Sequence, residues 1–200
     1  MKPHAKSMEI DMRTRWSLAL AVGALTGLPV EAQVPDELLQ MNAETTVAPQ
    51  VFHEDERDGV GVMWSLIRSQ NHDGLGCSVV FNDAGGLVWI SGPADGTERA
   101  GKTGWLSFGG GSIPPSKKPK QVSLSIRSNG ATQQASALHV SLSDEQHMLR
   151  IPVNIGDLVA QNDKSMKVSV DLNGKQVFSS EIVELQMAYA ELKKCMGLTE

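Results

Sequence analysis

The chain has 200 residues, with 18 Lys and Arg against 23 Asp and Glu, a formal charge of -5 and 2 Cys. A length typical of one domain and an apolar fraction of 40% predict a single globular domain with attached segments. The acidic total disfavours nucleic acid as a partner, and two cysteines are too few for a disulfide-rich scaffold or an all-cysteine zinc site.

Residues 1–32 have the pattern of a cleaved signal peptide. Two arginines precede an uncharged stretch over Trp16–Leu28, and cleavage is expected after Ala32; Met12 is an alternative start. An N-terminal membrane anchor or a buried helix fits less well, because 13 residues is short of the roughly 20 that span a bilayer. We therefore expect a periplasmic or secreted protein with no transmembrane span after cleavage.

Segment 33–58 is expected to be an acidic, flexible leader. It holds seven acids and one base, Arg57, whereas 59–200 holds 13 of each. Few large apolar side chains are available there to offset the entropy lost on ordering. We interpret 52–56 as solvated linker rather than as a metal or partner-docking site, and place the start of a single β-rich domain at Gly59.

Short runs of β-branched and aromatic residues recur beyond Gly59, separated by Gly, Asn, Asp and Pro. Asn173-Gly174 between two alternating runs predicts a two-residue hairpin turn, because both positions accept positive φ. Strands are expected at 60–67, 77–81, 87–90, 105–108, 122–126, 138–142, 148–153, 167–172 and 175–179.

Two helices are also expected, one between the strands at 148–153 and 167–172 and one after the last strand. One is a short helix at 155–161, and the other is an amphipathic C-terminal helix whose apolar residues keep helical spacing from Leu185 to Met196. Gly197 can end it in the left-handed conformation. The expected fold is mainly β, an antiparallel sandwich or partly open barrel with both helices packed on it.

The two cysteines, Cys77 and Cys195, are expected to form a disulfide, because export delivers the chain to an oxidising compartment. A redox or metal-binding pair is the alternative, but no Cys-x-x-Cys motif occurs. The bond would attach the C-terminal helix to the second predicted strand.

The loop 109–120 is rich in Gly and Pro and is expected to be flexible and exposed. Lys117, Lys118 and Lys120 make it basic, and they are our candidate interaction residues. They would bind an anionic surface such as phospholipid headgroups or lipopolysaccharide; alternatively, they are solvating charges on an exposed loop.

Histidine and tryptophan offer two further interpretations. His139 and His147, with Met148 adjacent, could face each other as a copper-like site, but we expect His139 to be solvated and assign no metal and no cofactor. The three tryptophans that follow the signal-like segment, at 64, 89 and 105, are expected in the core; the alternative is a carbohydrate-stacking platform.

No nucleophile elbow, phosphate loop, dinucleotide fingerprint or zinc-protease motif occurs in the sequence. We assign no catalytic residue and expect no enzyme activity, although two acids could still meet across a cleft as in a small hydrolase.

From Val153 onward, the order short helix, Lys-rich turn, strand, Asn-Gly-Lys, strand and C-terminal helix resembles the invasion-associated locus B family of alphaproteobacterial periplasmic proteins. A Trp before a Gly-x-Gly-Cys strand, and a helix with Ala188, Leu192 and Cys195 in Ala-x-x-x-Leu-x-x-Cys spacing, are similar to other small exported proteins of these bacteria. The resemblance implies a periplasmic or secreted β domain in host association or envelope integrity, without established catalysis.

Together these observations favour an exported, non-enzymatic interaction module with an envelope or host partner. The alternatives are a small periplasmic hydrolase and an inhibitor of a lytic enzyme that inserts the loop 109–120 into its target.

Overall fold

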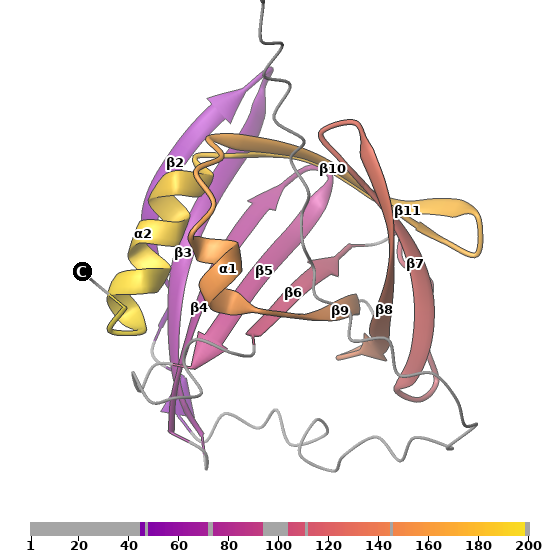
Figure 1. The fold of residues 1–200 in the computed structure, drawn as a ribbon, viewed down its shortest axis with the longest axis horizontal. Helices are drawn as coiled ribbons and strands as arrows, with labels where there is room; N and C mark the ends of the chain where they lie inside the picture. Colours follow the sequence, from indigo (N-terminus) through magenta and orange to yellow (C-terminus); the bar gives the residue numbers. More distant parts are fainter. Residues whose placement is uncertain are drawn as a thin grey trace, which may run out of the picture.

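The computed structural model describes residues 45–46, 48–71, 74–93, 104–110, 112–144 and 146–198. The predicted signal peptide and the leader up to residue 44 lie outside these residues. Within them, the chain forms one antiparallel sheet of 11 strands with two helices, which confirms the mainly β prediction (Figure 1).

All nine predicted strands and both predicted helices are present. The elements are β1 (Thr45–Thr46), β2 (Gln50–Arg57), β3 (Val60–Asn71), β4 (Gly74–Asp83), β5 (Gly86–Pro93), β6 (Gly104–Gly109), β7 (Lys120–Ser128), β8 (Ala131–Ser141), β9 (His147–Val153), α1 (Ile155–Val159), β10 (Ser165–Leu172), β11 (Lys175–Val183) and α2 (Leu185–Cys195).

The strand order is β1-β3-β4-β5-β6-β9-β8-β7-β10-β11, with β2 also paired to β3. Most strands pair with a neighbour in sequence, and three pairs join strands that are not consecutive: β1 with β3, β6 with β9 and β7 with β10. All the described strands belong to one sheet, and β11 at one end of it is not paired with the strands at the other end, so the structure is a single open sheet and not two packed sheets. The sheet curls around α1 and α2, which lie on its concave side (Figure 1).

The expected domain start at Gly59 is wrong, because residues 50–57 form strand β2, paired with β3. Asp58 and Gly59 are the turn between the two strands, with φ of 52° and 76°. This is the Asp-Gly hairpin signal, whose residues tolerate positive φ. Phe52 on β2 stacks against Trp64 at 6.4 Å between ring centroids, so this part of the acidic segment is packed and not a free linker.

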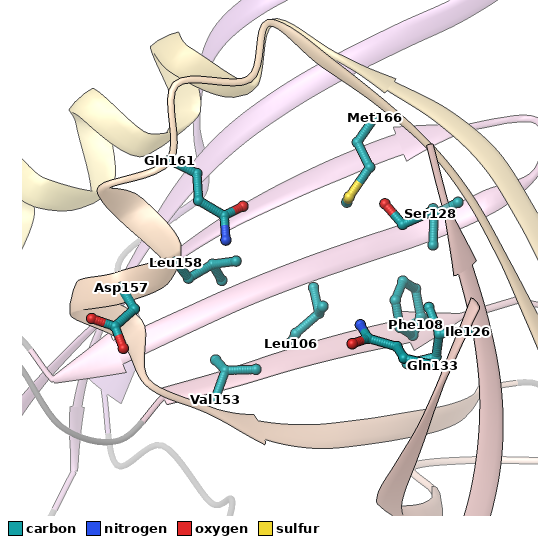
Figure 2. A pocket seen from close by; sticks show the side chains of 11 residues that line it. Leu106, Phe108, Ile126, Ser128, Gln133, Val153, Asp157, Leu158, Gln161 and Met166 are labelled. Atoms are coloured by element: carbon teal, nitrogen blue, oxygen red, sulfur yellow. The ribbon is translucent and has the colours of Figure 1, made fainter. Parts of the chain in front are cut away.

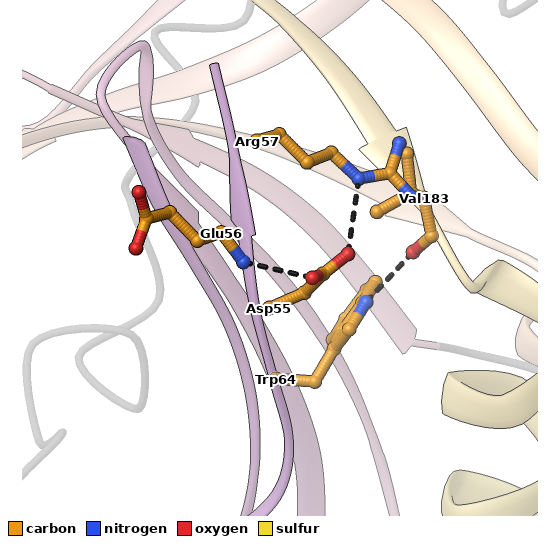
Figure 3. Close-up of polar contacts among 5 residues, drawn as sticks. All are labelled: Asp55, Glu56, Arg57, Trp64 and Val183. Atoms are coloured by element: carbon orange, nitrogen blue, oxygen red, sulfur yellow. Dashed lines mark hydrogen bonds and ion pairs between the residues drawn. The ribbon is translucent and has the colours of Figure 1, made fainter. Parts of the chain in front are cut away.

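The tryptophans divide between the two faces of the sheet. Trp64 is fully buried, and its indole N–H donates to the Val183 carbonyl at 2.7 Å (Figure 3). Trp89 and Trp105 are half-buried on the opposite face, where the Arg150 guanidinium lies 4.8 Å from the Trp105 ring centroid. The expectation that all three fill the core is therefore wrong for Trp89 and Trp105, which strand alternation turns outward.

Cys77 and Cys195 form the expected disulfide, with Cα atoms 6.0 Å apart. Cys77 lies on the concave face of β4, and Cys195 is the last residue of α2. Leu185, Ala188 and Leu192 on α2 are buried against the same core. The bond and this apolar stripe together hold α2 on the sheet.

Candidate functional site: the basic rim

The connection between β6 and β7 is anchored to the domain, contrary to the flexible loop expected there. Ile113 is 1% exposed within the main core cluster, and its N–H donates to the Gly110 carbonyl at 3.1 Å. A buried isoleucine side chain contributes roughly 2–3 kcal/mol relative to its exposed state. The β6–β7 loop is therefore pinned near its middle by an apolar side chain.

Polar contacts fix the same loop to the end of the β8–β9 hairpin. The Ser116 N–H donates to Ser141 Oγ at 2.9 Å, and Ser141 Oγ lies 2.9 Å from His147 Nδ1. The Ser116 hydroxyl donates to the Lys118 carbonyl at 2.7 Å. The loop is thus held to Ser141 of β8, which in turn contacts His147 of β9.

His139 provides a further anchor, since its Nε2 lies 2.8 Å from the Pro114 carbonyl oxygen. A carbonyl only accepts, so Nε2 carries the proton and the neutral ring has its lone pair on Nδ1, which is buried without a partner among the described residues. Burial lowers the pKa of His139 below 6.5, and Lys120 and His147 lower it further against the opposing effect of the Pro114 bond. The predicted solvated histidine is wrong: alternation does place His139 on the face opposite Leu138, but side chains on both faces of β8 are buried there.

Three lysines project from this anchored frame. Lys117, Lys118 and Lys120 are exposed, and none has an ion pair with any residue that the structure describes. Leu142, directly after Ser141, is 45% exposed. We call six exposed residues in or next to these two adjoining loops the basic rim: Pro114, Pro115, Lys117, Lys118, Lys120 and Leu142. Ser112, Ser143, Asp144 and Gln146 are also exposed in these loops.

The Ser141–His147 contact has the spacing of a nucleophile and its base. Ser141 Oγ, however, also accepts the Ser116 N–H, and no carboxylate is bonded to His147 among the described hydrogen bonds. The pair therefore serves as a loop anchor. In the described part of the chain, no group of three or more His, Cys, Asp or Glu is arranged to hold a metal ion.

The lysines of the rim were identified from the sequence, whereas their anchors were not. Ile113 between Ser112 and Pro114 is the one local signal for burial, because an apolar side chain in a polar loop needs a partner surface. The partners of Ser116 and Pro114 lie 25 residues further along the chain, at Ser141 and His139. The local residue pattern therefore does not predict which residues of the β8–β9 hairpin the loop contacts.

No family model, curated protein or solved structure matches this chain. Among the residues described, no helix has the length and apolar character needed to cross a membrane.

Proposed function

We propose that this protein is an exported, non-catalytic envelope-association module that contacts anionic lipid headgroups through the basic rim. The observation behind the proposal is the combination of an anchored loop with unpaired lysines. Because Ile113, Ser116 and His139 already hold the loop, little conformational entropy remains to be lost when it meets a partner.

The magnitudes fit weak, reversible association. A lysine near an anionic membrane surface contributes about 1 kcal/mol, so three contribute about 3 kcal/mol at low salt. The exposed Leu142 adds an apolar contact beside them. Asp144, in the turn after Leu142, lowers the local positive potential but forms no ion pair with the lysines.

Export is supported by the signal-like segment 1–32 and by the disulfide, which persists in an oxidising compartment. The likeness to the invasion-associated locus B family favours the same setting.

The inhibitor hypothesis is less well supported, because Ile113 and Ser116 are buried against the domain and the loop does not stand free for insertion into a cleft. The hydrolase hypothesis is less well supported because no described hydrogen bond joins His147 to a carboxylate that would orient it as a base.

The test is cosedimentation of the chain from Gln33 onward with phosphatidylglycerol or phosphatidylcholine vesicles at low and high salt. We expect binding to phosphatidylglycerol only, lost at high salt. Replacing all three rim lysines by Glu should abolish it. The matched control replaces Lys164, Lys175 and Lys194, which are exposed elsewhere and give the same net charge. Absence of vesicle binding, or equal loss in both triple variants, would show the proposal to be wrong.

A further inference from the structure

A second feature, independent of the basic rim, is a cavity of about 40 Å³ inside the curled sheet (Figure 2). It lies between α1 and the concave side of β6, β7, β9 and β10, and it is open on one side. Most of its wall is apolar. The side chains of its floor and walls include Leu106, Phe108, Ile126, Val153, Leu158 and Met166.

One polar group in this wall has no hydrogen-bond partner. Ser128 at the end of β7 is 6% exposed, and its hydroxyl oxygen is buried and unpaired in the part of the chain that the structure describes. Figure 2 shows the hydroxyl on the cavity side, near Met166. An unpaired buried hydroxyl lowers stability, so this position is better explained by a bound group than by packing alone.

Ordered water is a poor candidate for that bound group. Buried waters typically make about three hydrogen bonds, whereas Ser128 is the one buried polar side chain among the residues that line the cavity. A slender hydrocarbon with one oxygen fits better, because the apolar wall receives its methylene groups and the oxygen pairs with Ser128.

The mouth of the cavity restricts the charge of a ligand. Gln133 and Gln161 place two amides there, and Asp157 at the start of α1 adds an exposed carboxylate. A carboxylate at the mouth repels an anionic ligand, so a fatty acid is disfavoured relative to an uncharged molecule. No residue of the basic rim lines the cavity.

We propose that the cavity binds an uncharged, unbranched aliphatic alcohol or ester, with the oxygen hydrogen-bonded to Ser128 Oγ and the alkyl chain against Leu106, Phe108 and Met166. The site does not depend on lipid contact at the rim. Its failure and the failure of the envelope proposal are therefore distinguishable.

The experiment follows the Met166 methyl signal by NMR in protein labelled at the methionine methyl groups, assigned with Met166→Leu. The probes are linear alcohols from propanol to octanol, with pentyl chloride and pentanoate as matched molecules that lack the neutral oxygen. Affinity should rise about fourfold for each methylene that enters, and level off once the cavity is filled. Pentanol should bind more tightly than pentyl chloride, and pentanoate least.

Ser128→Ala keeps the space and removes the hydroxyl. It should weaken pentanol binding about three- to tenfold and leave pentyl chloride unchanged. Ser128→Val also fills the space and should weaken both. Ser107→Ala is the control, because Ser107 is equally buried on β6 but does not line the cavity.

Three results would overturn the proposal. The first is that the alcohols shift all methionine signals alike. The second is that affinity keeps rising with chain length through octanol. The third is that pentanol and pentyl chloride bind the unmodified protein with equal affinity. The last comparison needs no variant and stands even if a Ser128 variant fails to fold.

Discussion

At the residue scale, His139 connects the basic rim to the core through a group that titrates. Its folded-state pKa lies below the ordinary 6.5 because burial disfavours the charged ring. Between pH 6.5 and that lower value, the unfolded chain binds a proton that the folded chain does not. The contribution of His139 to stability is therefore greatest above pH 6.5, falls as the pH decreases through this window, and is constant again below it.

We expect His139→Gln to remove this contribution to the pH dependence of stability. The Gln side-chain amide can still donate to the Pro114 carbonyl but does not titrate near neutrality. Urea midpoints from pH 7.5 to 5 should fall less for the variant than for the unmodified protein. If both lose the same stability over this range, the buried ring is not the titrating group.

At the element scale, α2 depends on two attachments, its apolar stripe and the disulfide. The bond closes a loop over 118 positions and removes roughly 5 kcal/mol of chain entropy from the unfolded state. We expect Cys77→Ala with Cys195→Ala to cost about 3–5 kcal/mol in urea unfolding, with early hydrogen exchange in α2. Reduction of the unmodified protein is the control and should give the same cost. A loss below about 1 kcal/mol would contradict this role.

The elements also show what local sequence can and cannot predict. Asn173-Gly174, with φ of 53° and 75°, is predicted as a hairpin turn from the sequence because both residues readily take positive φ. Asp58-Gly59 has the same chemistry, but β2 is an edge strand with mostly exposed polar residues, so composition concealed it. Pairing of β6 with β9, and of β7 with β10, joins strands distant in sequence and leaves no local signal.

The candidate functional residues likewise include some that local sequence predicts and some that it does not. Lys117, Lys118 and Lys120 are adjacent in sequence, so composition alone identifies them. Ser128 looks like an ordinary polar residue of an alternating strand. Its burial results from the curl of the sheet and from α1 above it, and neither can be deduced from the residues of β7.

At the scale of the whole molecule, the sheet is open in its hydrogen bonding but held closed by side chains. The closing contacts join β11 to the β4–β5 turn and to β6, and we call them the seam. Ser180 Oγ donates to Asp83 Oδ2 at 2.7 Å, and the Phe108 and Phe178 rings lie 5.1 Å apart between centroids. A Cβ atom at Gly85 would collide with the Ser179 carbonyl oxygen, so this approach requires glycine.

We therefore expect Gly85→Ala to push the β4–β5 turn away from β11 and open the seam. Overpacking of this kind costs about 1–3 kcal/mol. The matched control is Gly61→Ala on β3, where a Cβ atom would meet nothing within 4 Å. Hydrogen exchange should quicken in β11 for Gly85→Ala alone, because the contacts released are those of that strand. Equal exchange in the two variants would mean that the continuous ladder, without the seam, is enough to hold β11 in the curled sheet.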